Sequence, residues 1–291
     1  MDRQITPIPL VALLVGASAM AIGPWFVRMA DVGPMASAFW RLSFGSAMLF
    51  VLAATLGRQL RLPRRGLTVL LVVAGFFFAA DLGAWHEGIL LTKMGNSVLF
   101  GNFGSFVFAC YGLLLARVWP RTTQVAALVM AVVGSLLLLS GSLDLGPETF
   151  WGDILCLMAG LFYAGYLIAV DKARPSLDPL PLLAWISLFA ALMLLPVAAS
   201  TPEALVPTNW GPVLMLALSS QVVGQGLLVY AIGRLPPLVV GLGLLTQPAV
   251  AGVVGWIVYG EVFTIKDWAG AVMIGAALVL VRLRRRVPAA T

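Results

Sequence analysis

Hydrophobic residues come in ten long runs along this chain, separated by short polar stretches. Two of them contain a stretch, at 69–80 and at 125–139, with no charged residue at all. Each run is about 20 residues long, enough for an α-helix to cross a bilayer, and none alternates apolar and polar residues as a barrel strand does. The pattern therefore predicts ten transmembrane helices, over residues 8–28, 34–56, 67–91, 95–116, 122–140, 150–171, 179–199, 210–232, 236–259 and 266–283.

The ten predicted helices form two sets of five with the same order of apolar runs and polar breaks. An offset of about 144 residues places Arg28 on Lys172 and Asp81 on Gln225. Identity at this offset is sparse, so hydropathy and charge carry the comparison. Because five is an odd number, the second set enters the membrane from the opposite side. The sequence thus predicts an inverted repeat, 1–143 and 144–291, which is common in secondary transporters.

Composition favours a fold embedded in the membrane. Hydrophobic residues make up 61% of the 291 residues and charged residues 10%, against about 45–50% and about 25% in ordinary soluble domains. Ten helices of about 20 residues use roughly 200 positions, which leaves short loops and no room for a separate soluble domain. We expect an all-α integral membrane protein, with ten transmembrane helices in two inverted five-helix repeats around a central cavity.

The placement of basic residues argues against a nucleic-acid partner, although the net charge is +6. The loop at 57–65 has four arginines, whereas its counterpart at 201–209 has no basic residue. By the positive-inside rule, this bias places the basic loops and both termini in the cytoplasm. The basic C-terminal segment is expected to lie near anionic lipid headgroups. Membrane lipids, and no nucleic acid, are therefore the expected surroundings.

Polar groups within the third predicted helix are candidates for function, because a charge in hydrocarbon costs about 2.5–3.5 kcal/mol. Asp81 and Trp85 share one helical face, and His86, the only histidine, lies about 140° around the helix from Asp81 and faces a different neighbour. This cluster can bind a zwitterion or relay a proton. The structural alternative pairs Asp81 with Arg41 and leaves His86 and Glu87 at the level of the outer headgroups.

The eighth predicted helix, which corresponds to the third, carries Gln221 and Gln225 on one face at i, i+4. Neutral amides can hold a substrate without the cost of a buried charge. They can equally serve to join neighbouring helices, through hydrogen bonds worth about 1 kcal/mol each. The sequence leaves both alternatives open.

A third group combines aromatic and amide side chains at mid-span depth: Asn102, Tyr163, Tyr166 and Gln247. Aromatic residues near span ends, such as Trp151, typically form an interfacial belt. Tyr163 and Tyr166 lie deeper, which favours contact with a substrate. Plain helix packing is the alternative for this stripe.

Glycines loosen the fourth and ninth predicted helices at corresponding places. Gly101 and Gly104 lie in the fourth, and Gly241 and Gly243 precede Pro248 in the ninth. Interrupted helices at equivalent positions of two repeats are typical of a central transport site, so we predict hinges at these four glycines. Close packing of helix backbones is the simpler explanation for any one of them.

The sequence carries no motif of the common enzymes. It has no H-E-x-x-H, no nucleophile elbow and no Walker A sequence. Cys110 and Cys156 lie within predicted spans and are expected to be small packing residues, without a disulfide or metal role. We expect no enzymatic activity, no cofactor and no metal.

These residues resemble the drug/metabolite transporter superfamily, and within it the EamA-type ten-span exporters, over nearly the whole chain. The resemblance rests on Phe39-Trp40-Arg41-Leu42, Asp81 with Trp85-His86, Asn96 and Asn102, Gly224-Gln225-Gly226-Leu227-Leu228 and the turn Tyr259-Gly260-Glu261. The third helix is most similar to YddG-type aromatic amino-acid exporters. The family commonly has Glu-Pro in the ninth helix, where this chain has Gln247-Pro248, so a coupling role for that carboxylate does not carry over.

The resemblance implies a basket of ten helices around a central cavity. Helices 1, 3, 4, 6, 8 and 9 would line the cavity, and helices 5 and 10 would brace the outside. Alternating access would come from bending of the third, fourth, eighth and ninth helices about their glycines.

From these features we expect a monomeric, multi-pass exporter of the bacterial inner membrane whose substrates are amino acids, aromatic ones first, or related small metabolites. An exporter of threonine- or homoserine-like amino acids or of drugs is the alternative within transport. A membrane enzyme or scaffold that binds a lipid in the cavity is the alternative from another class. Proton coupling through Asp81, His86 or Glu87 and uncoupled uniport both remain open.

Overall fold

The computed structural model describes residues 7–92, 94–117, 119–140, 146–259 and 264–282, which form helices and turns without a strand. The turn residues Gly260 and Glu261 and the predicted boundary between the repeats at 143/144 lie outside these ranges. The helices are α1 (Pro7–Ala21), α2 (Gly23–Met29), α3 (Pro34–Thr55), α4 (Arg65–Leu91), α5 (Met94–Gly101), α6 (Phe103–Ala116), α7 (Thr122–Leu139), α8 (Phe150–Ala173), α9 (Pro179–Ser200), α10 (Trp210–Leu216), the π-helix η1 (Ala217–Gln225), α11 (Gly226–Ile232), α12 (Pro237–Leu244), α13 (Gln247–Tyr259) and α14 (Ile265–Arg282).

The predicted all-α membrane fold is confirmed, and the predicted count of ten spans fits it roughly. Among the described residues, eight helical stretches are long and apolar enough to cross a membrane by length and composition. The apolar stretch of α7 is shorter, and the 18 residues of α14 include Lys266 and Asp267 in their first turn. Together these stretches match the ten predicted runs, with ends that differ by a few residues.

In the part of the chain that the structure describes, breaks between helices interrupt three spans. The fourth span breaks at Asn102, between α5 and α6, and the ninth breaks at Leu245 and Thr246, between α12 and α13. At the repeat offset, Asn102 falls on Thr246, so these two breaks are equivalent. The first span breaks at Ile22, two residues before Pro24. Proline has no N–H for the helical ladder, which accounts for this break.

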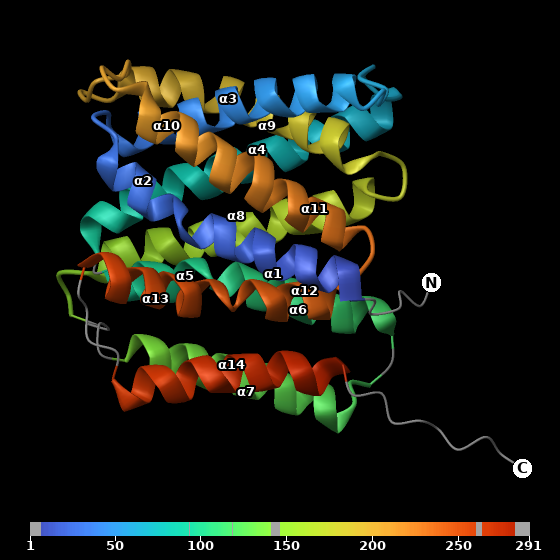
Figure 1. Ribbon diagram of the computed structural model, residues 1–291, viewed down its shortest axis with the longest axis vertical. Helices are drawn as coiled ribbons and strands as arrows, with labels where there is room; N and C mark the ends of the chain where they lie inside the picture. Colours follow the sequence, from blue (N-terminus) through green and yellow to red (C-terminus); the bar gives the residue numbers. More distant parts are fainter. Residues whose placement is uncertain (1–6, 93, 118, 141–145, 260–263, 283–291) are drawn as a thin grey trace, which may run out of the picture.

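The helices lie in layers that extend along the long axis of the molecule (Figure 1). The pair α3 and α9 lies at the top of the view, the pair α7 and α14 lies at the bottom, and the remaining helices pack between them. The contacts repeat when the two halves are exchanged: α4 packs on α8, and the equivalent η1 and α11 pack on α1. The fifth and tenth spans, α7 and α14, pack mainly on each other as an outer layer.

The loops joining α3 to α4, α8 to α9 and α11 to α12 gather at one end of the molecule, together with the start of α1 (Figure 1). We name this the basic end, because these loops carry Arg58, Arg61, Arg64, Arg174 and Arg234. The two halves are tied together here by an ion pair of 3.3 Å between Arg58 Nη1 and Asp178 Oδ2.

The halves are also tied together at the opposite end, which we name the far end. Asp31, in the α2–α3 loop, accepts hydrogen bonds from the hydroxyl and backbone N–H of Thr208 and from the N–H of Asn209. The Thr208 hydroxyl contributes most to lowering the pKa of the exposed Asp31 carboxyl below its ordinary value of 3.8. The loop after the second span thus meets the loop after the sixth at the basic end, and the loop after the first meets the loop after the seventh at the far end. Loops that are equivalent at the repeat offset therefore lie at opposite ends.

Glycines allow the helices to pack closely in the half of the molecule nearer the basic end. A Cβ atom on Gly104 would lie 2.1 Å from the Gly160 carbonyl oxygen, and one on Gly241 would lie 2.4 Å from the Ser105 carbonyl oxygen. None of the predicted hinge glycines has a positive φ. The close contacts, and not a special backbone conformation, therefore explain Gly104 and Gly241. Helix packing closes this half of the molecule.

Candidate functional site

A cavity lies in the half of the molecule nearer the far end. Its walls come from the first and third spans, the start of the fourth and the second part of the ninth. The second and eighth spans add two residues each, and the sixth adds one. Its empty space, counted together with its open mouth, is about 1030 Å³. The side chains used below are Met20, Arg41, Asp81, Trp85, His86, Ser97, Gly101, Asn102, Ser105, Tyr163, Gln225 and Gln247.

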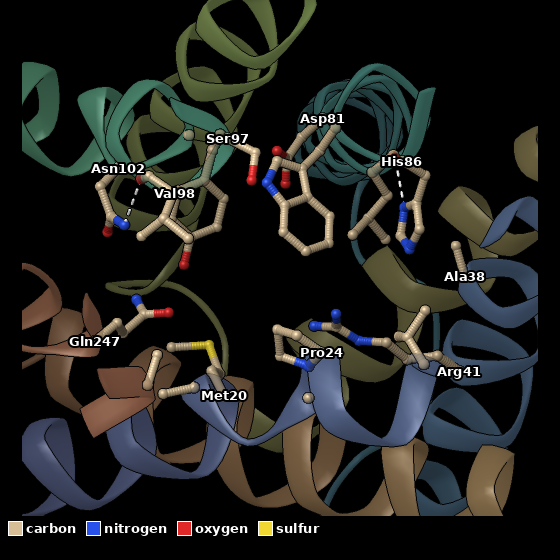
Figure 2. Close-up of a pocket in the computed structure, with 18 of the residues that line it drawn as sticks. Met20, Pro24, Ala38, Arg41, Asp81, His86, Ser97, Val98, Asn102 and Gln247 are labelled. Atoms are coloured by element: carbon tan, nitrogen blue, oxygen red, sulfur yellow. Dashed lines mark hydrogen bonds between the residues drawn. The ribbon is translucent and has the colours of Figure 1, made fainter. Parts of the chain in front are cut away.

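Helix α4 supplies Asp81, Trp85 and His86 to the wall (Figure 2). Within the described part of the chain, the Asp81 carboxylate accepts no hydrogen bond. His86 is buried, and its Nδ1 lies 2.6 Å from the carbonyl oxygen of Leu82. Because a carbonyl oxygen only accepts, Nδ1 carries the hydrogen and Nε2 is an acceptor in the neutral ring. Nε2 has no hydrogen-bond partner among the described residues.

The angle between Asp81 and His86 was expected to direct them to different neighbours, yet both border the same cavity. The cavity extends around α4 from the α5 side to the α3 side, so one helix contributes two of its faces. Figure 2 shows the His86 ring on the side of Ala38 and Arg41, away from Ser97 and Asn102.

Arg41 of α3 faces the cavity, although the second span was not expected to contribute. Its Nε donates a hydrogen bond of 3.3 Å to Gln221 Oε1. Gln221 Nε2 in turn donates to Ser187 Oγ at 2.8 Å. Gln221 is fully buried and does not reach the wall. It lies behind Arg41, so the structure gives Gln221 a supporting position.

Gln225 reaches the wall together with Tyr163, whereas Tyr166 lies behind them. Tyr166 is fully buried, stacks on Phe78 at 4.5 Å between ring centroids, and donates a hydrogen bond to Gln225. Tyr163 stacks on Tyr166 at 5.7 Å and accepts a weak hydrogen bond of 3.5 Å from Gln225 Nε2. The predicted tyrosine stripe therefore divides into one cavity residue and one supporting residue.

The breaks in the fourth and ninth spans both lie beside the cavity. Gly101 contacts the Trp85 indole, where a Cβ atom would lie 3.3 Å from the ring. Asn102 faces the cavity and donates a hydrogen bond of 2.8 Å from its amide to the Val98 carbonyl oxygen. Gln247, the first residue of α13, points inward from the opposite wall, and its amide has no hydrogen-bond partner among the described residues (Figure 2).

The structure therefore brings most of the predicted site residues together. Those at the cavity wall are Asp81, Trp85, His86, Asn102, Tyr163, Gln225 and Gln247. Tyr166 and Gln221 lie one layer behind it. Of the four predicted hinges, Gly101 lies at the wall and next to a helix break. Gly104, Gly241 and Gly243 instead pack against neighbouring helices.

Some wall residues were not predicted, namely Met20, Pro24, Ser97 and Ser105, and Arg41 was considered only as a partner of Asp81. The Gly23-Pro24 pair inside an apolar run was the available signal for a break in the first span. Ser97 and Ser105 gave no such signal, because serine is common within membrane helices.

Comparison with known proteins places this fold among transporters. Residues 150–283 match the EamA-like transporter family. The threonine/homoserine exporter RhtA of Escherichia coli (strain K12) is 27% identical over 267 residues, covering 88% of this chain and 85% of that protein. RhtA of Salmonella typhimurium (strain LT2) is 26% identical over 290 residues, covering 97% and 94%. A crystal structure with 15% sequence identity superposes with a TM-score of 0.77 over 94% of each chain, a likeness of fold alone.

Proposed function

Since this chain is a member of the drug/metabolite transporter superfamily, we propose that it exports amino acids through the cavity by alternating access. In this proposal it acts as a monomer in the bacterial inner membrane, with both termini and the basic end in the cytoplasm. The observation that carries the proposal is the set of groups at the wall. Arg41 and Asp81 supply one charge of each sign within the membrane-embedded part of the chain, where charges are expensive and typically functional.

We propose aromatic amino acids as the leading substrates. The Trp85 and Tyr163 rings offer flat apolar surfaces at the wall, and aromatic pairs stack or meet edge to face with gains of about 0.5–1.5 kcal/mol. Asn102, Gln225 and Gln247 supply uncharged hydrogen-bonding groups for the polar end of the substrate.

Amino acids with a hydroxyl side chain are the second candidate, favoured by the names of the relatives. RhtA proteins are threonine/homoserine exporters, and they align with most of this chain. Nε2 of His86 is a buried acceptor without a partner in the described structure, which suits a hydroxyl donor.

The described conformation supports an exporter cycle with the cavity open toward the outside. The wall residues lie in the half nearer the far end, and close packing of α6 with α8 and α12 closes the other half. The opposite state requires α6 and α12 to separate, while α5 and α13 approach each other. The equivalent breaks at Asn102 and Thr246 are where we propose that the fourth and ninth spans bend.

Export from intact cells tests this proposal. Bacteria are fed a dipeptide, and the released amino acid is measured in the medium, once for phenylalanine and once for threonine. Cells expressing the protein should release phenylalanine several times faster than cells with an empty vector, and faster than cells expressing Asp81→Asn. Faster release of threonine alone would favour the second candidate. Release equal to the empty vector for every amino acid would refute amino-acid export.

A further inference from the structure

Arg41 is fixed at the cavity wall by a chain of hydrogen bonds from three helices. Its Nε bonds Gln221 of η1 at 3.3 Å, and Gln221 bonds Ser187 of α9 at 2.8 Å. Ser187 Oγ in turn donates to the Leu183 carbonyl oxygen at 2.7 Å. Gln221 and Ser187 are fully buried. Because buried Gln221 and Ser187 support it, the Arg41 side chain is held in one orientation. An arginine held in this way is suited to recognising a planar anion.

The outer edge of this guanidinium points into the cavity. Arginine has five N–H groups, and Gln221 uses only the one on Nε. No other hydrogen bond to Arg41 is found in the described ranges, so Nη1 and Nη2 remain available at the wall. Figure 2 shows them directed toward the centre of the cavity, below Asp81. Two parallel N–H groups match the two oxygens of a carboxylate.

Asp81 stands opposite as the complementary group. Its carboxylate has no hydrogen-bond donor among the described residues, and it interacts electrostatically with Arg41 across the cavity. The other titratable groups that interact electrostatically with Arg41 are Tyr163 at the wall, Tyr166 behind it, and His86 on the same helix as Asp81. The pair is thus one cation and one anion separated by open space. A free α-amino acid carries one group of each sign and no net charge.

We propose that Arg41 binds the substrate's carboxylate and Asp81 its ammonium group, so that the site selects molecules carrying both. This inference rests on the proposed function and defines the substrate class by its α-amino and carboxylate groups, not by its side chain. Binding exchanges one distant ion pair for two short ones without changing the charge of the site. It follows that a carboxamide, which keeps the ammonium group and loses the anion, is a poor substrate.

Transport of matched pairs into proteoliposomes tests this assignment, with phenylalanine against phenylalaninamide and threonine against threoninamide. The wild-type protein should prefer each acid by about tenfold or more. Arg41→Met should lose this preference. Arg41→Lys keeps the positive charge but lacks the two parallel N–H groups of the guanidinium, so it should keep part of the preference. Arg58→Met is the matched control, because Arg58 lies at the basic end, paired with Asp178. It should keep the wild-type preference.

The outcomes separate this inference from the proposed function. Transport of the acids by the wild type, with an unchanged preference in Arg41→Met, overturns the role of Arg41 alone. A wild type that moves no amino acid overturns the proposed function, and this inference with it. If Arg41→Met does not fold, the thermal stability of the wild-type protein tests the assignment instead. Phenylalanine should raise its melting temperature more than the amide does at equal concentration, and equal protection overturns the assignment.

Discussion

The phenol of Tyr166 donates a hydrogen bond of 3.0 Å to Oε1 of Gln225. Both side chains are almost completely buried. The bond fixes which end of the Gln225 amide is the acceptor, and so directs Nε2 toward Tyr163 and the cavity wall. Tyr166, which lies behind the cavity wall, thereby determines that Gln225 presents its amide N–H groups to the wall.

Replacing Tyr166 with Phe should lower the free energy of unfolding by about 1–2 kcal/mol, because a buried acceptor loses its donor. It should also weaken transport, since the Gln225 amide becomes free to turn. Denaturant titration in bicelles measures the first effect. Tyr230→Phe is the control, because the Tyr230 hydroxyl makes no hydrogen bond within the described residues. A Tyr166→Phe protein as stable as Tyr230→Phe would show that the bond contributes nothing.

Replacing Gly104 with Ala should destabilise the protein by about 1–3 kcal/mol, the usual cost of overpacking. The new Cβ would lie 2.1 Å from the backbone oxygen of Gly160, so α6 must move away from α8. Gly226→Ala is the matched control, because nothing lies within 4 Å of its added Cβ. Melting temperatures of the two variants should differ by several degrees. If the melting temperatures are equal, close packing does not explain why position 104 is a glycine.

The tie between Asp31 and Thr208 should make stability depend on acidity. The hydrogen bonds favour the charged carboxylate, so the pKa of Asp31 in the folded protein lies below its ordinary value of 3.8. The stability that the Asp31 carboxylate adds to the folded protein is present above pH 3.8 and is lost as the pH falls through the lowered pKa. The wild type should therefore lose more thermal stability on acidification than Asp31→Asn, which has no charge to lose. Parallel curves for the two proteins would contradict this.

Gly45 should be needed for the position of Arg41, although it does not line the cavity. A Cβ atom there would lie 2.4 Å from Cγ of Gln221, so Gly45→Ala should displace Gln221 and release the Arg41 side chain. We expect a reduced preference for acids over carboxamides, with the charge still present. Gly66→Ala, which adds a Cβ with nothing within 4 Å, is the control. An unchanged preference in Gly45→Ala would argue against the claim that Gln221 holds Arg41 in position.

Span positions could be predicted from the sequence because hydropathy alone fixes them. The bends could be predicted only in part. Gly101 marked the break at Asn102, but the break at Ile22 and the π-helix from Ala217 to Gln225 were missed. A π-helix depends on how its span packs against neighbouring helices, and here it carries both Gln221 and Gln225. Helical periodicity cannot reveal such a widened turn.

Polarity and depth in the membrane could predict which residues lie near the site. They could not predict which of these residues reach the cavity wall and which lie behind it. Asp81, Trp85 and His86 stood out as polar or aromatic groups deep in a span, and they reach the cavity. Tyr166 and Gln221 satisfied the same criteria and lie behind it. The angle around one helix gives the direction of a side chain, whereas its layer depends on which helix lies opposite. That information comes only from the packed structure.

Counterflow in proteoliposomes tests the central claim most directly. Vesicles containing purified protein are loaded with unlabelled phenylalanine, and labelled phenylalanine is added outside. The label should enter and accumulate transiently, far above the level in vesicles without protein, and Tyr163→Ala or His86→Ala should reduce that accumulation severalfold. The same experiment with threonine distinguishes the two substrate classes. Label at the level of protein-free vesicles for every amino acid would contradict the account.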